Sequence, residues 1–312
     1  PAGLTDTERA TILPQLVEAL APYIDSAEFA ESFYGALLAA AEAGGGGSDT
    51  VVAAMRTARG QPPSLAEIDW SPVVAGSFPV GCFRDAGDAG NDNEALHEVA
   101  LSPYRVARST VTIADYRAFR NTHGESRWPA GIPAIRVNWY EAMAYCHWLN
   151  DLFSRSTGFA GASIARLVRA QEWRVALSSE LEWEKAARGA DDARSYPWGE
   201  TFNAARCNVE ESGFGGTTPV GIFLNGASPY GCLDMAGNVW EWTRSRWADY
   251  PYDARNEVQA DLTADDTDLL VRGGSWSGFR GFARCAFRGR DPPGSRVNSL
   301  GFRVVLRSPP VL

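Results

Sequence analysis

Short hydrophobic runs separated by Gly, Pro, Asp and Asn fill this chain from Asp69 to its end. The runs are of β type, and only two segments, at about 139–152 and 179–188, have the pattern of helices. Long irregular connections are costly unless something holds them, so we expect buried Trp side chains to do so. The sequence therefore predicts an α+β domain with short antiparallel strands, two helices and long loops. The candidate strands are Val99–Leu101, Tyr104–Ala107, Val220–Phe223, Leu269–Arg272 and Phe302–Leu306.

Residues 1–65 have a different, helical pattern. Thr5 and Glu8 have the spacing of a capping box, and apolar residues recur so that each helix has one apolar face. A helical bundle of this size is marginal alone, so we expect it to pack on a partner protein, on a second copy, or on the larger domain. The sequence thus predicts a helical adaptor domain at 1–65, with a Gly-rich linker at 44–48 that is natural or introduced, and a second domain at 66–312.

Composition and charge exclude several classes of protein. The chain has 312 residues, of which 45% are apolar, enough for a sizeable core. Its formal net charge of −9 argues against nonspecific binding of nucleic acid, which requires a basic surface. No stretch approaches the roughly 20 uninterrupted apolar residues of a membrane-spanning helix, and no export leader is evident. We therefore expect a globular, cytoplasmic protein that contacts neither nucleic acid nor membrane.

The cysteines and histidines do not have the spacing of a zinc site. The three histidines lie far apart, and no two cysteines form a Cys-x-x-Cys pair. Scattered single cysteines in a chain without a leader are typical of reduced, buried thiols rather than of disulfides. The five cysteines are Cys82, Cys146, Cys207, Cys232 and Cys285.

Arginines cluster near the end of the chain. Lys185 is the single lysine among 29 basic residues, so arginine is the usual cation of this protein. We expect most of the clustered arginines to be structural, stacking on aromatic rings and pairing with carboxylates. They are Arg280, Arg284, Arg288, Arg290, Arg296 and Arg303.

A series of motifs follows in a fixed order along the second domain. Val74–Gly81 begins it, Leu177–Arg188 and Tyr230–Trp242 continue it, and Val271–Trp276 (VRGGSW) and Ser299–Val305 (SLGFRVV) end it. The series resembles the formylglycine-generating-enzyme (sulfatase-modifying factor) family, whose fold is an elaborated C-type lectin. The resemblance implies that the last two motifs are core strands, and that the Trp of the VRGGSW motif is buried.

The two catalytic branches of this family use metals that the residues here do not suit. The oxidases bind copper through two cysteines, and Gly278 and Ala283 stand at about those positions, while Cys285 resembles a non-catalytic position. Soft sulfur ligands select copper(I), and glycine and alanine offer none. The sulfoxide synthases bind iron through histidines of an N-terminal helical domain, and residues 1–65 contain no histidine. We therefore expect neither copper nor iron.

The remaining branch binds ligands and includes variable proteins whose genes are diversified by retroelements. There, the segment between a GGSW and a GFR anchor is rewritten, and residues 277–298 resemble such a segment. Its aromatic, arginine and small residues have the composition of binding surfaces, with an unidentified protein as the expected ligand. Phe282 or Phe287 is expected to be buried. The implied variable positions are Ser277, Gly278, Phe279, Phe282, Phe287, Gly289, Arg290, Gly294, Val297 and Asn298.

The family also binds structural calcium through loop oxygens, which suit a hard cation. The matching positions here are Asn208 and the Val209 carbonyl for one ion, and Asn238 with nearby backbone carbonyls, and Glu241 as a further candidate, for another. Ser212 replaces a carboxylate of the first site. Alternatively, the two asparagines bond to local backbone amides.

Three functions remain open at this point. We favour a noncatalytic binding protein with a variable surface at about 277–298, whose N-terminal helices serve assembly. The alternative is an enzyme similar to the sulfatase-modifying oxidases with a divergent metal site. A third possibility is an accessory protein whose N-terminal helices are the functional part.

Overall fold

The computed structural model describes residues 68–82, 95–120, 132–155, 167–168, 170, 172–257 and 268–308. The predicted helical domain at 1–65 and its linker lie outside the described residues. The helices are α5 (Ile113–Arg120), α6 (Trp139–Arg155) and α8 (Glu180–Arg188). The strands are β1 (Trp70–Val73), β2 (Gly76–Val80), β3 (His97–Leu101), β4 (Tyr104–Ala107), β5 (Arg174–Leu177), β6 (Trp240–Arg246), β7 (Leu269–Arg272), β8 (Gly289–Asp291), β9 (Leu300–Phe302) and β10 (Val304–Arg307).

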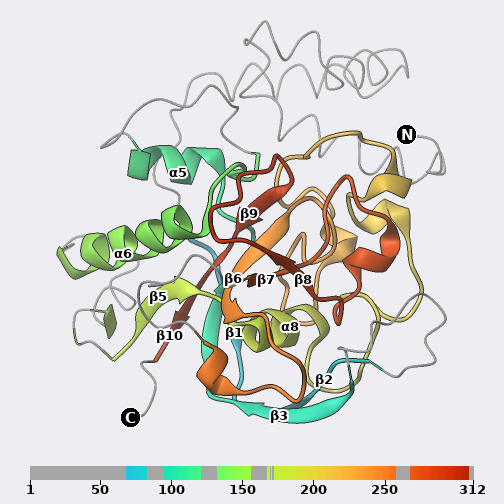
Figure 1. Ribbon diagram of the computed structural model, residues 1–312, viewed down its shortest axis with the longest axis horizontal. Helices are drawn as coiled ribbons and strands as arrows, with labels where there is room; N and C mark the ends of the chain where they lie inside the picture. Colours follow the sequence, from blue (N-terminus) through green and yellow to red (C-terminus); the bar gives the residue numbers. More distant parts are fainter. Residues whose placement is uncertain are drawn as a thin grey trace, which may run out of the picture.

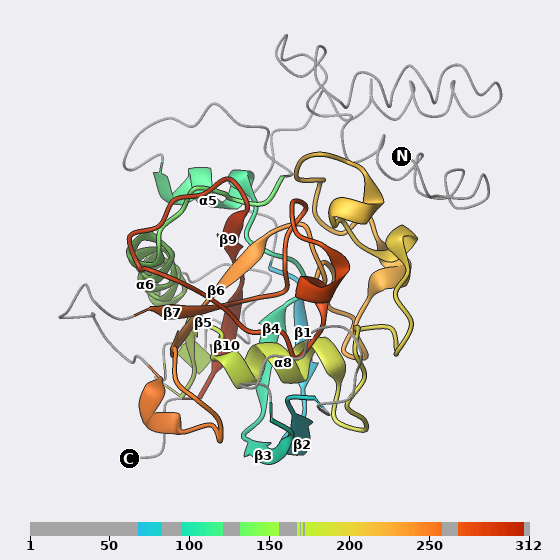
Figure 2. The ribbon, with the colours of Figure 1, turned by 45° about the vertical axis from the view of Figure 1, so that its right-hand side comes forward.

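The strands form two four-stranded sheets and a separate β2–β3 pair. One sheet has the order β1-β4-β10-β5 and is antiparallel throughout. The other has the order β8-β7-β6-β9, in which β6 and β9 run parallel, an exception to the predicted antiparallel pairing. Figures 1 and 2 show α5 and α6 on one side of the sheets. Helix α8 lies between the sheets and the β2–β3 pair. Short 3₁₀ turns and loops cover the opposite side.

Local capping explains where the helices begin. Ser179 accepts a hydrogen bond from the backbone of Glu182, whose side chain accepts one from the backbone of Ser179, so the predicted helix at 179–188 begins with a capping box. The predicted helix at 139–152 is confirmed as α6, which runs three residues further. Helix α5 was not predicted. Its signal is the pairing of Thr112 with Asp115, whose carboxylate accepts the Thr112 backbone N–H at 3.0 Å.

The predicted strands agree with the structure in part. Strands 104–107 and 269–272 are confirmed. The segment 302–306 is divided between β9 and β10, because Arg303 separates them. Val220–Phe223 is wrong as a strand: Gly221 has a φ of 78°, and its N–H donates to Asp234 Oδ2 at 2.6 Å, so the chain turns there.

Three fully buried Trp side chains hold the long connections, as expected. The indole N–H of Trp139 donates to the Thr243 carbonyl at 3.0 Å, and that of Trp242 donates to the Val137 carbonyl at 2.9 Å. The indole of Trp183 donates instead to a carboxylate, described below. Each ring thus fills the core and also ties two distant segments through a satisfied hydrogen bond.

Helix α8 is buried along its whole length, although it carries three glutamates and two cations. Glu180 pairs with Arg288 at 2.5 Å, and Glu182 pairs with Arg244 at 2.5 Å. Burial raises the pKa of the Glu182 carboxyl, but Arg244 more than offsets this and holds that pKa below its usual value. The glutamates of α8 are therefore bound to arginines through buried ion pairs.

The third glutamate of α8, Glu184, joins three separate parts of the domain. It pairs with Arg188 at 3.0 Å and with Arg272 at the end of β7, and it accepts the Gly81 N–H at 2.8 Å. All of these charged side chains are fully buried. Because the pairs are satisfied only when α8, β7 and the end of β2 are together, they fix the mutual position of these elements.

Half of the clustered arginines are buried in the core, whereas a structural role was predicted for most of them. Arg284, Arg288 and Arg303 are buried, whereas the other members of the cluster are exposed. The Arg288 guanidinium also stacks on Tyr250, with 4.0 Å between the guanidinium carbon and the ring centroid. Arginine here supplies the cations of the core as well as those of the surface.

Four of the five cysteines are free thiols and are buried, while Cys82 is half-buried. The prediction of reduced, buried thiols is confirmed for those four. Among the helices in the described ranges, none combines the length and the apolar character needed to cross a bilayer.

Replacing Glu184 by alanine is expected to destabilise the domain strongly. The change leaves Arg188 and Arg272 buried without their carboxylate, and breaking such a pair lowers the free energy of unfolding by about 3–5 kcal/mol. Asp69→Ala, which removes an exposed pair with Arg108, is the control and should cost less than about 1 kcal/mol. Chemical denaturation measures both, and equal effects would contradict the importance of the buried network.

Asp234 generates a pH-dependent prediction. Burial raises the pKa of this carboxyl from 3.8 to about 6. Its folded-state pKa is thus above the unfolded one, so its contribution to stability is complete below pH 4 and lost as pH rises through 6. The difference corresponds to about 3 kcal/mol.

Asp234→Asn removes this titration, keeps an acceptor for Gly221, and suits the positive φ of 56°. Relative to the wild type, the variant should be about equally stable at pH 4 and more stable at pH 8, with the change between pH 4 and 6. Thermal unfolding across that range measures the difference between the two proteins. A difference that does not vary with pH would show that Asp234 does not titrate there.

Candidate ligand-binding surface

Two glycines begin the segment that leaves β7 and returns in β9. Gly273 and Gly274 have φ values of 95° and 73°. A Cβ on Gly273 would lie 3.0 Å from the Trp183 ring, and one on Gly274 would lie 3.0 Å from the backbone of Phe282. Both positions therefore require glycine for conformation and for space.

The segment is bonded to loops from an earlier part of the chain. The Glu210 N–H donates to the Gly278 carbonyl at 2.9 Å, and the Cys285 N–H donates to the Ser195 carbonyl at 2.8 Å. The Arg280 N–H donates to both carboxylate oxygens of Glu211. In Figures 1 and 2 the 3₁₀ turn at 280–283 accordingly lies beside the loops of residues 204–226. Its backbone is thus held by groups that are independent of its own exposed side chains.

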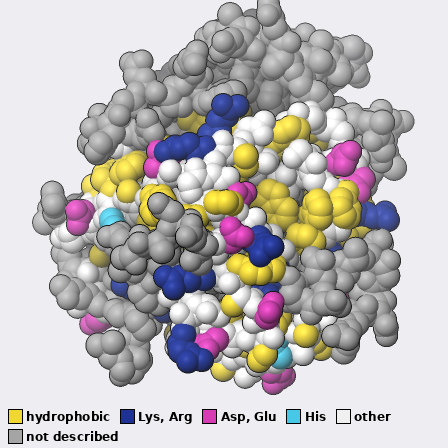
Figure 3. Space-filling model, in the orientation of Figure 1, with side chains coloured by type: hydrophobic (Ala, Val, Ile, Leu, Met, Phe, Trp, Pro, Cys, Tyr) yellow, Lys and Arg dark blue, Asp and Glu magenta, His cyan; other side chains and the backbone are white. Residues whose placement is uncertain are grey.

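Aromatic rings from this segment form a cluster at the surface. The ring centroids of Phe279 and Phe282 lie 4.1 Å apart, and those of Phe282 and Phe287 lie 4.8 Å apart. Trp240 of β6 lies beneath, with its centroid 6.0 Å from Phe282 and 5.9 Å from Phe287. Phe279 is 42% exposed. Figure 3 shows hydrophobic side chains gathered on this face. We call Trp240, Phe279, Phe282 and Phe287 the aromatic cluster.

Two expectations about burial are corrected here. Neither Phe282 nor Phe287 is buried; both are half-buried, because they lie on Trp240, which is itself half-buried at the surface. Trp276 is also half-buried, and its indole N–H donates to the Asn298 carbonyl at 3.5 Å. It lies at the edge of the surface rather than in the core.

The predicted variable positions differ in how freely they can change. A Cβ on Gly278 would lie 2.9 Å from the Phe282 ring, and one on Gly289 would lie 2.9 Å from Val271. A larger residue at Gly278 requires the Phe282 ring to move at the surface. A larger residue at Gly289 would clash with Val271 of β7. Phe282 and Phe287 are half-buried. The exposed positions are Ser277, Phe279, Arg290, Gly294, Val297 and Asn298.

Gly278 and Ala283 are the positions that the family resemblance matched to the thiols of the oxidases. Gly278 and Ala283 have no metal-binding side-chain atom, and Ala283 is fully buried. Cys285 is also fully buried, and burial raises the pKa of its thiol to about 12. A buried neutral thiol is a poor nucleophile and a poor metal ligand.

Two of the predicted calcium ligands do not fit an ion. Glu241 is bound on both oxygens by Arg303, at 2.6 and 2.7 Å, and also accepts the indole N–H of Trp183. Asn238 accepts the Thr218 N–H through Oδ1 and donates to the Thr218 carbonyl through Nδ2. The alternative interpretation, in which the asparagine bonds to nearby backbone, therefore describes Asn238.

Asn208 and Val209 fit better. Asn208 Oδ1 is buried and has no hydrogen-bond partner, while its Nδ2 donates to the Gly216 carbonyl at 2.9 Å. The Val209 carbonyl accepts the Ser212 N–H and has a second lone pair. Calcium binding stays a prediction, confined to this turn. Across the part of the chain that the structure describes, no three or more His, Cys, Asp or Glu side chains form a group that could hold a metal.

The two small sheets, the long tied loops and the surface segment define a C-type-lectin-like domain. The chain belongs to the family described as sulfatase-modifying factor enzyme 1-like domain, whose model matches residues 66–308. The family resemblance inferred from the motifs is therefore confirmed.

Relatives within this family include an enzyme and a protein described as inactive. The formylglycine-generating enzyme of Bos taurus is 30% identical over 188 residues, which cover 55% of this chain and 43% of that protein. The inactive C-alpha-formylglycine-generating enzyme 2 of Bos taurus is 31% identical over 186 residues, or 55% of this chain and 49% of that one. The chain thus spans less than half the length of either relative.

Two solved structures share the fold. PvdO from Pseudomonas aeruginosa has a TM-score of 0.60 and 25% identity, covering 76% of this chain and 93% of PvdO. Treponema denticola variable protein 1 has a TM-score of 0.55 and 22% identity, covering 78% of this chain and 98% of that protein.

Truncation of two phenylalanines should separate surface from core. Phe279→Ala removes an exposed ring and is expected to lower the free energy of unfolding by less than about 1 kcal/mol. Phe302→Ala removes a fully buried ring of β9 and should cost about 3–5 kcal/mol. Denaturant titration of both variants measures these effects. A large cost for Phe279→Ala would mean that the aromatic cluster is part of the core.

Proposed function

We propose that this protein is a noncatalytic binding protein whose ligand, a protein, contacts the surface at about 277–298. The observation that carries the proposal is the aromatic cluster, which lies half-buried at the surface with Phe279 exposed, on a backbone that is held independently of these side chains. Exposed rings of this kind are a liability unless they serve contact with a partner. Aromatic side chains supply large contact area at low entropic cost, and this is why they dominate binding hot spots.

The arrangement of the backbone supports this proposal. Gly273 and Gly274 fix the start of the segment, and Glu210 and Glu211 hold its middle through hydrogen bonds to or from backbone atoms. Because the partners of these bonds are backbone groups, exchange of Ser277 or Phe279 leaves them in place. A pre-organised surface loses little entropy on binding, whichever side chains it carries.

We further propose that the segment is diversified by a retroelement. The exposed positions should then differ among isolates of the source organism, while Gly273, Gly274 and Gly301 stay constant, since a Cβ at each would meet neighbouring atoms at 3.0 Å or less.

Sequencing the flanking DNA tests diversification directly. We expect a reverse-transcriptase gene nearby and a near-identical repeat of the segment coding for 271–306 that is richer in Asn codons. Isolates that differ equally at the anchors and at the surface, with no such repeat, would contradict the proposal.

A second candidate function is favoured by the match to the formylglycine-generating enzyme. In that case the protein would oxidise a cysteine of a peptide substrate through a divergent copper site. We expect instead that the purified protein holds no stoichiometric copper and leaves a cysteine-containing sulfatase-motif peptide unchanged. Elemental analysis and mass spectrometry of the peptide measure both. Tightly bound copper that is lost in Cys285→Ser would support the enzyme and overturn the binding proposal.

A further inference from the structure

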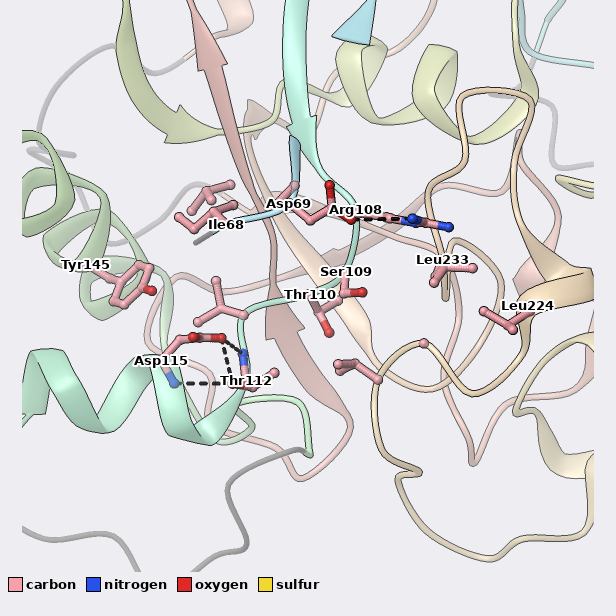
Figure 4. A pocket seen from close by; sticks show the side chains of 15 residues that line it. Ile68, Asp69, Arg108, Ser109, Thr110, Thr112, Asp115, Tyr145, Leu224 and Leu233 are labelled. Carbon is pink, nitrogen blue, oxygen red and sulfur yellow. Dashed lines mark hydrogen bonds and ion pairs between the residues drawn. The ribbon is translucent and has the colours of Figure 1, made fainter. Parts of the chain in front are cut away.

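A pocket of about 440 Å³ lies where β4 leads into α5, and it is outside the proposed ligand surface. Its walls come from the chain around Ala107–Thr112, from the turn at 220–224, and from Leu233 and Tyr145. The volume is in the range of small-molecule sites, roughly 300–1,000 Å³. In Figure 4 the hydroxyls of Ser109 and Thr110 lie between Asp115 on one side and Leu224 and Leu233 on the other.

The walls of this pocket are fixed by the core. Buried Arg303 donates to the carbonyls of Ala107 and Arg108, at 3.1 and 3.2 Å, and to that of Leu233 at 2.9 Å. The Leu233 N–H in turn donates to the Arg108 carbonyl at 2.7 Å. Two opposite walls are therefore bonded to one guanidinium, and that guanidinium is neutralised by Glu241. A pocket built in this way is formed before any ligand binds.

One polar group in the pocket lacks a partner. Thr110 is 3% exposed, and its Oγ1 makes no hydrogen bond. A buried hydroxyl without a partner is destabilising, which makes it a ready contact for a ligand group. The rest of the pocket surface is mainly apolar, from side chains such as Val111, Val304 and Leu233.

The charges that line the pocket are already partnered. Asp69 pairs with Arg108 at 3.4 Å, and Asp115 accepts both the N–H and the hydroxyl of Thr112. Asp69 is therefore neutralised by Arg108, and Asp115 is held by two hydrogen bonds from Thr112. A charged ligand would lose its hydration without a compensating partner, whereas a neutral one meets apolar walls and a free hydroxyl.

We propose that this pocket binds an uncharged, mainly apolar ring compound through one hydrogen bond to Thr110. The apolar body lies against Val111, Val304 and Leu233, and its single hydroxyl or carbonyl group bonds to Thr110 Oγ1. The site is separate from the aromatic cluster and is independent of the function proposed for it.

The test uses four probes of one shape in equilibrium dialysis with the full chain. They are 2-naphthol, naphthalene, 2-naphthoate and 2-naphthylmethylammonium. We expect 2-naphthol to bind at one site and to exceed naphthalene in affinity by roughly three- to tenfold, the worth of one hydrogen bond. Both should bind more tightly than the two ions. Tighter binding of either ion, or no binding of any probe up to its solubility, would overturn the proposal.

Variants assign the binding to the pocket. Thr110→Val should remove the preference for 2-naphthol over naphthalene while leaving naphthalene bound, and Thr201→Val, at an exposed threonine outside the pocket, should change neither. Leu224→Trp should fill the pocket and weaken both probes, whereas Val74→Trp, at another exposed position, should not. The proposed site would be wrong if Thr110→Val kept the preference for 2-naphthol over naphthalene, or if Leu224→Trp bound both probes as tightly as the wild type.

The stability of the unliganded protein provides a further readout. Because Thr110 Oγ1 has no partner, Thr110→Val should keep or raise the melting temperature. A large fall would show that the hydroxyl bonds within the protein and is not free for a ligand. If Thr110→Val does not fold, Thr110→Ser, which keeps the hydroxyl, should retain the preference for 2-naphthol, and loss of it would count against the proposal.

Discussion

The pairing of buried glutamates on α8 with arginines from later segments is the interaction on which this domain depends. Glu182 meets Arg244 of β6, Glu184 meets Arg272 of β7, and Glu180 meets Arg288 just before β8. Burying these charges is unfavourable unless each glutamate is paired with its arginine. The pairs therefore stabilise the one arrangement of α8, β6 and β7 in which all of them form. Segment 273–287 lies between two of the paired arginines, Arg272 and Arg288. Its ends are therefore fixed to the core while its exposed side chains take no part in that attachment.

This division between core and surface bears on the two functions considered for this chain. By the family resemblance, Gly278 and Ala283 stand at about the positions of the oxidase thiols. Gly278 lies beneath Phe282, Ala283 is buried, and the nearby thiol of Cys285 is also buried. The outer side of the same segment presents rings instead. The accessible side of this segment therefore presents aromatic carbon rather than sulfur, which suits the proposed contact surface better than a metal site.

Features coded by neighbouring residues were predictable from the sequence, and features that depend on distant partners were not. The start of α8 follows from Ser179 and Glu182, three residues apart, and was predicted correctly. The segment 220–223 looks like a strand, but Gly221 turns because its N–H meets Asp234. Sequence motifs placed Glu241 in a calcium site, yet its carboxylate is bound by Arg303, 62 positions away.

The same reasoning applies to the candidate ligand surface. The aromatic composition of 277–298 was visible in the sequence, but the half-burial of Phe282 and Phe287 depends on Trp240 from another strand. The pocket beside α5 was not predicted at all, since its walls come from segments more than 100 positions apart.

The position of β10 has a consequence for how the protein is made. This strand pairs with β4 on one side and β5 on the other, so it occupies the middle of its sheet although it is the last strand described in the chain. While the ribosome synthesises the domain, the edges of β4 and β5 that later pair with β10 are unpaired. Glu241 likewise lacks its partner until Arg303 has been made. Such long-range closure is slow and leaves apolar edges exposed in the meantime. Chains interrupted before this strand would therefore be substrates for chaperones and proteases rather than partly working proteins.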